Sequence, residues 1–374
     1  MRNITRDIRL DVLRFIAVFL VLGRHTYGIL YKLVEMPAEQ RTMSESFFVL
    51  WQRIGWVGVD LFFVISGFLI SDLIFKNVKK GGFSFKKFFI RREFKIYPPF
   101  LLLIIVTIVF FKVRHHPFSY INVLKELFFV QNYTQGLWNH TWSLAVEEHF
   151  YILLPLLIIF LYKKNAIKIL PAVLIGVSVT VLVVRILHVK YYVGNYNEAD
   201  FYLPTHLRID SFIPGVLIAY FKNFSESRYN ALLKINRLWY LAFFVVAMVF
   251  LWNVPEMNFW MLTFGLTIIS VGFAALLLLF LATDRSKFDK WAIFRGMAII
   301  GKDSYSIYLW HMCVMYWGVS ALYQASHIKF PMYIIIPLYM VTSVIIGVVM
   351  AMLIEQPVLK FRDKYFPSYT TKNS

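Results

Sequence analysis

The first long apolar run of the sequence contains two ionisable residues, Arg14 and His25, whose types could do chemistry. A charged side chain at the centre of a membrane costs roughly 2.5 to 3.5 kcal/mol, so such residues mark a site by default. The two are eleven positions apart, which in a helix places them on one face and about 16 Å apart along the axis. We predict that they line one pocket, with His25 as general base. Two simpler interpretations stay open: Arg14 as an anchor at the membrane boundary and His25 as an interhelical hydrogen-bonding group.

A second group of candidates lies at residues 142–151, where Trp142 leads into Glu147 and Glu148. Both carboxylates fall within the first turns of an apolar helix, so at least one must face inward. A carboxylate beside the outer part of the first span would orient His25 and stabilise its protonated ring. The alternative is a negative charge favoured by the dipole at a helix N-terminus. We predict that one of the two glutamates pairs with His25.

Three basic residues, Arg91, Arg92 and Lys95, lie within about one helical turn just before another apolar run. Such a cluster often anchors a membrane protein to lipid phosphate, and from charge alone the lipid interpretation is favoured. Arginines at this spacing also suit the phosphate groups of a soluble ligand, because each guanidinium can donate two parallel hydrogen bonds. The sequence leaves both interpretations open.

Further polar residues stand inside or at the ends of apolar runs, and we expect them to support the site. Asp60 and Ser66 share a run with three glycines, small residues that let another helix or a ligand approach closely; helix packing is the favoured interpretation. We expect Arg208 and Asp210 to pair in part with each other, and His311 to be hydrogen-bonded structure. The supporting set is Asp60, Ser66, Trp142, Arg208, Asp210, His311 and Glu355.

The composition places these residues in a membrane protein. About 59% of the 374 residues are hydrophobic and only 16% are charged, whereas typical soluble chains carry roughly 25% charged residues. Runs of about 18 to 20 apolar residues, each long enough to cross a bilayer core, recur along the chain. We predict an all-α, polytopic transmembrane helical bundle of about ten spans, near residues 10–30, 54–75, 96–111, 144–162, 167–187, 203–221, 238–252, 259–282, 301–321 and 331–354.

The distribution of basic residues predicts the orientation of these spans. With the N-terminus inside, the inside segments hold 27 of the 39 lysines and arginines, the outside loops hold 8 and the spans hold the other 4. Cytoplasmic loops retain basic residues, so both termini are predicted to be cytoplasmic. We expect one integral-membrane domain over residues 1–374, with a short cytoplasmic tail from about residue 356.

Several classes of function are disfavoured. In a membrane protein the net charge of +18 is first an orientation signal, so nucleic acid is not the expected partner. A single cysteine, Cys313, excludes an intramolecular disulfide. We find no metal-ligand spacing, phosphate-binding glycine loop or nucleophilic serine elbow, and we expect no metal site. The first apolar run contains Asp11 and Arg14, which predicts a membrane span rather than a signal peptide.

Together these strings resemble the membrane acyltransferase-3 family, whose members transfer acyl groups, usually acetyl, to hydroxyls of glycans and other acceptors. The resemblance covers nearly the whole chain and rests on seven motifs in the family's order: Leu10 to Arg14 with His25, Ser66 to Phe68, Phe89 to Pro98, Trp142 to Tyr151, Arg208 to Asp210 with Gly215, Ser304 to His311, and Glu355 to Pro357. Two positions depart from the family pattern, Lys95 in place of arginine and His149 in place of glutamine, and we expect altered contacts there. We expect the stand-alone form of the family, without an SGNH-type extension.

The resemblance implies roles for the residues named above. The donor is acyl-CoA, most simply acetyl-CoA, used as a co-substrate with no tightly bound cofactor. Its phosphates would lie near Arg91, Arg92 and Lys95, with Arg14 nearby, and its thioester would reach His25. The acceptor is a hydroxyl of a surface polysaccharide or related glycan, and the usual location is a bacterial inner or plasma membrane.

One competing hypothesis belongs to another class of protein: a secondary transporter or flippase of a lipid-linked or small amphipathic substrate, with the same ionisable residues as a proton relay. Inverted repeats, which many transporters contain, are not apparent in the sequence. Direct transfer and an acyl-histidine intermediate are both compatible with the motifs. The identity of the acceptor, the acyl chain and the oligomeric state stay open.

Overall fold

The protein is described by a computed structural model, in which residues 6–26, 43–192, 194, 196–254, 256–319, 321–322, 325 and 332–367 are placed. Over these residues the only regular elements are helices. Their sequences are dominated by leucine, isoleucine, valine and phenylalanine, which bury apolar surface or face lipid on every side of a helix. The predicted all-α class is therefore confirmed for the described residues.

Among the described residues, six helices are long and apolar enough to cross a membrane, and a seventh candidate is a pair of helices bent by 79°. The six are Phe47–Lys79, Phe85–Val113, Asn139–Lys163, Ile167–Tyr191, Met261–Ala282 and Tyr333–Tyr365, and the bent pair is Glu226–Lys234 with Arg237–Trp252. Each overlaps one of the predicted spans. The tail predicted from about residue 356 begins inside the last of these helices, which stays helical to Tyr365.

The predicted count of ten spans is not confirmed, because three of the predicted segments do not form a long apolar helix. The first, α1 (Ile8–His25), carries Arg9, Asp11, Arg14 and Arg24, and residues 27–30 lie outside the described part of the chain. The segment 203–221 opens with short 3-10 turns, so that α10 (Ile213–Phe224) has only 12 residues. In the segment 301–321, the α-helix α16 (Ser304–Cys313) gives way to a π-helical stretch.

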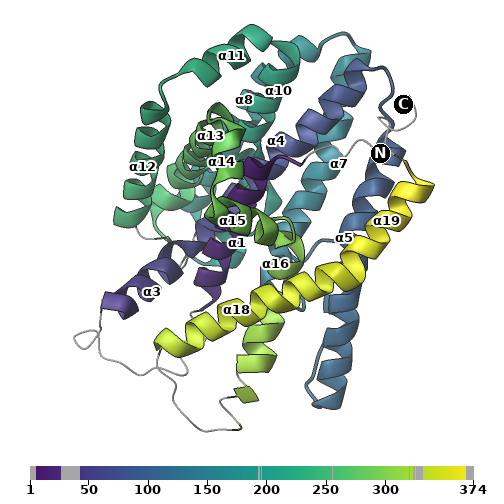
Figure 1. The fold of residues 1–374 in the computed structure, drawn as a ribbon, viewed down its shortest axis with the longest axis vertical. Helices are drawn as coiled ribbons and strands as arrows, with labels where there is room; N and C mark the ends of the chain where they lie inside the picture. Colours follow the sequence, from purple (N-terminus) through teal and green to yellow (C-terminus); the bar gives the residue numbers. More distant parts are fainter. Residues whose placement is uncertain are drawn as a thin grey trace. The chain divides into compact units, whose positions relative to one another are not determined.

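The chain forms two compact units. Unit 1 comprises residues 1–62 and 284–358. Its helices surround α1, which packs against the other elements along most of its length (Figure 1). They are α3 (Met43–Ile54), η2 (Gly55–Val57), α14 (Arg285–Lys290), α15 (Ala292–Gly301), α16, η8 (Val314–Val319), α18 (Met332–Met350) and η9 (Ala351–Glu355).

Glycines allow the closest approaches to α1. A Cβ atom at Gly301 would lie 1.9 Å from the carbonyl oxygen of Asp11, and one at Gly55 would lie 2.2 Å from that of Leu20. No side chain fits at such distances, so glycine is required where α15 and η2 meet α1. The tight packing fixes both ends of the helix that carries Arg14 and His25.

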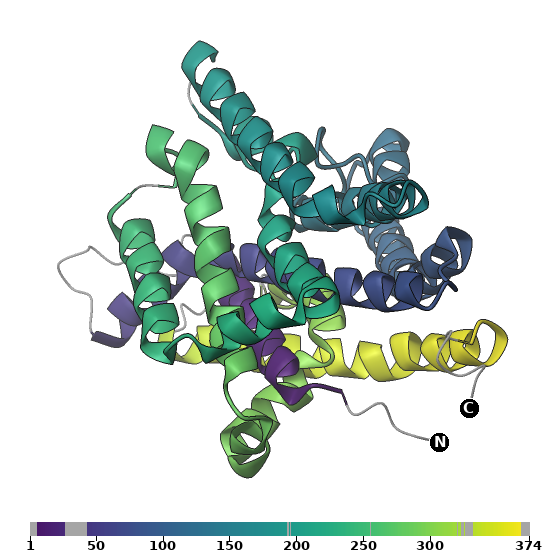
Figure 2. The same ribbon diagram turned by 90° about the horizontal axis from the view of Figure 1, so that it is seen from above.

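Unit 2 comprises residues 63–283 and 359–374. It contains most of α4 (Gly58–Lys79), the second half of α19 (Gln356–Tyr365), and α10. Its other elements are α5 (Phe85–Val113), α6 (Tyr120–Leu127), η3 (Asn139–Thr141), α7 (Trp142–Lys163), η4 (Ile167–Ile169), α8 (Leu170–Tyr191), α9 (Glu198–Phe201), η5 (Thr205–Leu207), η6 (Ile209–Phe212), α11 (Glu226–Lys234), α12 (Arg237–Asn253), η7 (Met261–Gly265) and α13 (Leu266–Ala282). Helices α12 and α13 lie side by side in both ribbon views (Figures 1 and 2).

Two glycines join α4 to the segment formed by η6 and α10. A Cβ atom at Gly67 would lie 2.2 Å from the carbonyl oxygen of Phe212, and one at Gly215 would lie 2.1 Å from that of Val64. The glycine-rich second span thus serves helix packing at Gly67, as the favoured interpretation of the sequence predicted. This contact holds Ser66 in place for the site described below.

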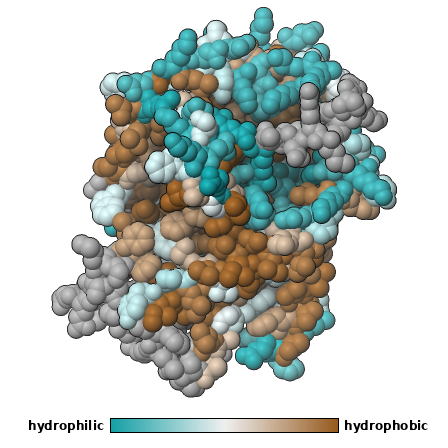
Figure 3. Space-filling view, viewed as in Figure 1, coloured by the Kyte–Doolittle hydropathy of each residue, from teal (hydrophilic) through white to brown (hydrophobic). Residues whose placement is uncertain are grey.

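The outer faces of several helices are apolar, as a lipid environment requires. Figure 3 shows hydrophobic side chains over α12 and over α18. Large exposed hydrophobic residues lie on both helices, among them Trp239 and Val246 on α12 and Val341 and Ile345 on α18. Because so large an exposed apolar surface would aggregate in water, we treat the chain as a multi-pass membrane protein.

Candidate functional site

In unit 1 the histidine at the end of α1 meets a second histidine. Nδ1 of His25 lies 3.0 Å from Nε2 of His311 on α16, and the two ring centroids are 4.8 Å apart. His311 is fully buried. The expectation of a hydrogen-bonded His311 is consistent with this placement, but the sequence did not predict that its partner would be His25.

The carbonyl groups around this pair determine where its protons lie. Nδ1 of His311 contacts the carbonyl oxygen of Tyr308, and Nδ1 of His25 lies 3.1 Å from that of Val21. A carbonyl oxygen only accepts hydrogen bonds, so both Nδ1 atoms carry a proton. Nε2 of His311 is then the acceptor that faces His25, and Nε2 of His25 carries a lone pair. This is the tautomer that a general base requires.

Arg14 lies in the same unbroken helix as His25, as the spacing argument required. Its guanidinium pairs with Asp11 one turn earlier, and Asp11 also accepts a hydrogen bond of 2.8 Å from Nε of Arg6. The side chain of Arg14 keeps 20% of its surface exposed. Arg14 is thus held by an acidic partner, and its predicted role beside the donor phosphates stays a prediction.

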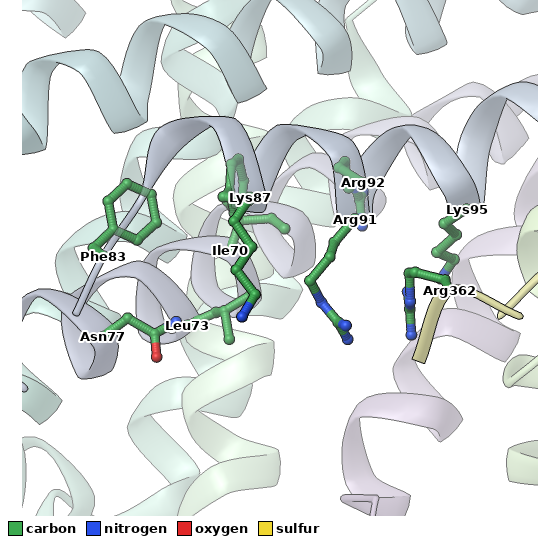
Figure 4. Close-up of a pocket in the computed structure, with 10 residues that line it drawn as sticks. Ile70, Leu73, Asn77, Phe83, Lys87, Arg91, Arg92, Lys95 and Arg362 are labelled. Carbon is green, nitrogen blue, oxygen red and sulfur yellow. The ribbon is translucent and has the colours of Figure 1, made fainter. Parts of the chain in front are cut away.

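In unit 2 the predicted basic residues line one cavity of about 180 Å³. Figure 4 shows the charged ends of Lys87, Arg91 and Arg362 in one row within it. The apolar part of the wall comes from α4 and from the start of α5. The complete lining is Ile70, Leu73, Asn77, Phe83, Lys87, Phe88, Arg91, Arg92, Lys95 and Arg362, which includes five cations and no carboxylate among the described residues.

Arg92 connects this cavity to the predicted glutamates. Its guanidinium donates to the hydroxyl of Tyr151 on α7 and lies over that ring, with Cζ 4.0 Å from the centroid. Tyr151 in turn contacts Ser66, whose hydroxyl donates to Oε1 of Glu147 over 2.8 Å. A continuous polar chain therefore runs from the cavity wall through the apolar interior of unit 2 to Glu147.

Glu148 faces a different part of the same network. It is buried, with 3% of its surface exposed, beside Glu93 of α5 and close to Arg92. The sequence predicted that Glu147 or Glu148 pairs with His25. Within unit 2 their partners are Ser66, Glu93 and Arg92, and the pairing with His25, which belongs to unit 1, stays a prediction.

The predicted supporting residues Arg208 and Trp142 form a cluster with an aromatic ring at the start of α7. The guanidinium of Arg208 is fully buried, 4.4 Å from the ring of Tyr202 and 5.9 Å from that of Trp142. The two aromatic rings lie 5.0 Å apart. Stacking of this kind suits a guanidinium, which is planar and more weakly hydrated than an ammonium group.

Asp210 has a partner that the sequence did not predict. Its carboxylate pairs with Arg185 of α8, and both side chains are almost completely buried. Arg185 is itself a charged residue inside an apolar run, so the rule that singled out Arg14 would also have found it. The pairing of Asp210 with Arg208 stays a prediction.

The remaining predicted residues lie in unit 1. Asp60 is fully buried in the first turn of α4. Glu355 is buried in η9 and accepts a hydrogen bond of 2.8 Å from the hydroxyl of Ser306. The described residues contain no group of three or more His, Cys, Asp or Glu side chains placed to hold a metal ion.

The chain is similar to known acyltransferases. The model of the Acyltransferase domain matches residues 7–352. The chain is 29% identical over 349 residues to O-acetyltransferase OatA of Staphylococcus aureus strain MRSA252, an alignment that covers 87% of this chain and 56% of the relative. It is 30% identical over 310 residues to OatA of strain NCTC 8325, covering 76% of this chain and 50% of the relative. The chain thus spans about half the length of these relatives.

No solved structure matches the chain. Both relatives are named O-acetyltransferases, so the comparisons give no support to the transporter alternative.

Proposed function

The chain belongs to the Acyltransferase domain family, and from that premise we propose that it is a membrane O-acyltransferase that moves an acetyl group from acetyl-CoA to a hydroxyl of a surface polysaccharide or related glycan. The names of the two relatives support acetyl as the group transferred. In the proposal the donor binds on the cytoplasmic side of a bacterial inner or plasma membrane. The acceptor enters from the other side.

The observation that carries the proposal is the histidine pair. The hydrogen bonds of His25 and His311 leave the lone pair on Nε2 of His25. In direct transfer this nitrogen takes the proton of the acceptor hydroxyl. At the same time the oxygen of that hydroxyl forms a bond to the thioester carbonyl carbon. The carbon–sulfur bond then breaks, and the CoA thiolate takes the proton from the imidazolium. His311 acts as a positioning residue that holds the ring of His25 in the required tautomer.

An acyl-histidine intermediate uses the same lone pair. In that route Nε2 of His25 attacks the thioester carbonyl carbon, the carbon–sulfur bond breaks, and CoA leaves as the thiolate. The acceptor oxygen then attacks the acyl-imidazolium, the carbon–nitrogen bond breaks to restore neutral His25, and the hydroxyl proton passes to the thiolate. Both routes need an anion that stabilises a positively charged imidazole. We assign this task to Glu147 or Glu148, on the strength of the family resemblance of residues 142–151.

The cavity of unit 2 supports a phosphate-bearing donor. Coenzyme A carries several phosphate groups, and guanidinium groups bind phosphate through paired, charge-assisted hydrogen bonds. The cavity is lined by Lys87, Arg91, Arg92, Lys95 and Arg362, and about 180 Å³ is free among them. We therefore assign Arg91, Arg92 and Lys95 to the donor's phosphates.

The test is transfer by the purified full chain. Wild-type protein in detergent should release CoA from acetyl-CoA when a hydroxyl-bearing glycan is present, and mass spectrometry should find acetyl groups on surface glycans only in cells that contain the gene. We expect His25→Ala to reduce transfer by about 10²-fold or more. The matched control is His116→Ala, a histidine that lies exposed in the segment after α5. Transfer by His25→Ala at a rate near that of wild type would overturn the proposal.

A further inference from the structure

One wall of the basic cavity comes from a helix near the end of the chain. Arg362, in the second half of α19, lines the cavity together with the arginines of α5, and its side chain is only 17% exposed. In Figure 4 its guanidinium lies beside that of Arg91. More than 260 positions separate the two residues in the sequence, and no motif considered above contains Arg362.

A single carboxylate joins these two arginines. Oδ1 of Asp363 lies 2.9 Å from Nη2 of Arg91 and 2.8 Å from Nη2 of Arg362, and it also accepts a hydrogen bond of 3.0 Å from Nε of Arg362. One oxygen atom thus receives hydrogen bonds from two guanidinium groups. The side chain of Asp363 is 56% exposed, so water competes for the same bonds.

The helix is held at the cavity by contacts that do not involve this carboxylate. The ring of Phe94 on α5 packs against Phe361 and Phe366, with centroids 6.0 Å and 5.4 Å apart. Arg91 also donates to the backbone carbonyl of Phe366. Removing the charge of Asp363 should therefore leave Arg362 in the cavity wall.

We propose that Arg362 binds a phosphate of the acyl-CoA donor together with Arg91, and that Asp363 is an internal counter-ion which that phosphate displaces. The inference rests on the proposed function, because it takes coenzyme A as the ligand of the cavity. It adds a binding residue from α19 to the predicted cluster on α5. It also makes the affinity for the donor depend on the charge at position 363.

Charge and geometry favour this exchange. A phosphate monoester carries about −1.5 to −2 charges and three acceptor oxygens, so it can satisfy two guanidinium forks at once, whereas Asp363 offers both of them the same oxygen. Exposed ion pairs contribute less than about fivefold to an equilibrium constant. The phosphate therefore gains more from the two arginines than the protein loses with the carboxylate.

The experiment is a titration of purified full-length protein with CoA by calorimetry, a readout that does not need turnover. Because CoA lacks the acyl group, no transfer takes place during the titration, and a difference in affinity between two variants reports the contact that the substitution changes. We expect Arg362→Gln to weaken binding about tenfold. We expect Asp363→Asn to strengthen it about two- to fivefold, because the competing anion is removed.

Two further variants serve as controls. Lys364→Gln removes one positive charge from the same exposed helix at a residue that does not line the cavity, and it should bind CoA as wild type does. Arg362→Lys keeps the charge but loses the fork, and it should bind CoA more tightly than Arg362→Gln. Unfolding midpoints close to that of wild type show that each variant is folded.

Three results would overturn the inference. The first is equal CoA affinity of Arg362→Gln and Lys364→Gln. The second is weaker binding by Asp363→Asn, which would make Asp363 a residue that positions the arginines. The third is an Arg362→Gln protein that loses affinity for phosphatidylglycerol nanodiscs but not for CoA, which would make the cavity a lipid headgroup site. A wild-type protein that does not bind CoA at all would instead refute the proposed donor.

Discussion

Arg185 and the cations of the basic cavity, all in unit 2, differ in how far the protein itself supplies their hydrogen-bond acceptors. Arg185 is 1% exposed and donates to the carbonyls of Leu207 and Thr263, to the hydroxyl of Thr267 and to the carboxylate of Asp210. The cations of the basic cavity instead line a space of about 180 Å³. Among the described residues that line this space, none is acidic. Arg185 is thus enclosed by its acceptors, whereas Arg91 and Arg362 share one oxygen of the exposed carboxylate of Asp363 and line a cavity.

The difference separates structural from ligand-binding charges. A charged residue inside an apolar run is costly in either case, and the cost alone does not show what it does. What matters is whether the protein supplies the acceptors. Arg185 has four acceptors within the protein, so a ligand would have nothing to add. A phosphate in the cavity would instead replace the single exposed carboxylate oxygen that Arg91 and Arg362 share.

Removing the buried arginine should have the largest effect on stability. Arg185→Met leaves the carboxylate of Asp210 buried without its guanidinium, and breaking a buried pair in this way costs about 3–5 kcal/mol. We expect the unfolding midpoint in detergent to fall accordingly, as measured by scanning fluorimetry. The double variant Arg185→Met with Asp210→Asn should recover part of the loss, because no unpaired charge remains. If Arg185→Met is as stable as wild type, then the buried ion pair does not stabilise the protein, and Arg185 is not a structural charge.

A buried carboxylate outside the spans provides an intermediate case. Glu126 accepts hydrogen bonds from the backbone N–H groups of Leu137 and Trp138 and from the hydroxyl of Thr141. Burial nevertheless raises the pKa of Glu126 to about 7, against the opposing effect of those hydrogen bonds. The described donors that hold Glu126 are all neutral groups.

The raised pKa of Glu126 predicts how stability depends on pH. The folded protein binds the proton more tightly than the unfolded chain, whose pKa is near 4.5. The stabilising contribution is thus complete below about pH 4.5 and is lost as the pH rises to about 7, a change of about 3 kcal/mol. Glu126→Gln should remove this part of the slope of unfolding midpoint against pH. An unchanged slope would contradict the assignment.

Neutralising the cavity cations should affect donor binding rather than stability. We expect Arg91→Gln and Lys95→Gln each to raise the KM for acetyl-CoA about tenfold while the KM for the acceptor and the unfolding midpoint stay near wild type. Steady-state kinetics with each substrate varied in turn measures both values. Lys80→Gln, at an exposed lysine near the end of α4, is the matched control. A larger effect on the acceptor, or a loss of stability like that of Arg185→Met, would contradict the phosphate assignment.

The sequence predicted those parts of the molecule that depend on local spacing. Arg91, Arg92 and Lys95 lie within about one turn of a helix, so their common cavity follows once α5 forms. Six apolar runs likewise became long helices because length and hydropathy are local properties. The span predicted at residues 203–221 is not confirmed, because this segment opens with short 3-10 turns. The length and hydropathy of an apolar run do not indicate such turns.

The parts that sequence reasoning missed depend on contacts between distant segments. His311 pairs with His25 across 286 positions, and Arg362 reaches the cavity of α5 from the end of the chain. Neither contact leaves a spacing that can be read along one helix. Arg185 is different, because its place inside an apolar run was visible and only its partner Asp210 was not.

The smallest expected effect is that of salt, and it tests the comparison without any mutation. The side chains of Arg91 and Arg362 are 21% and 17% exposed, so mobile ions can reach them, whereas Arg185 is 1% exposed. The screening length falls from about 10 Å at 0.1 M to about 3 Å at 1 M salt. We expect the KM for acetyl-CoA to rise about two- to fivefold between 0.1 and 0.5 M NaCl, and to rise less in Arg91→Gln, which has one cation fewer to screen.

The difference in unfolding midpoint between wild type and Arg185→Met should stay constant over the same range. If salt leaves the donor KM unchanged but narrows the stability difference, then the cavity cations are not the ones that bind an incoming anion, and the two groups have been assigned the wrong way round.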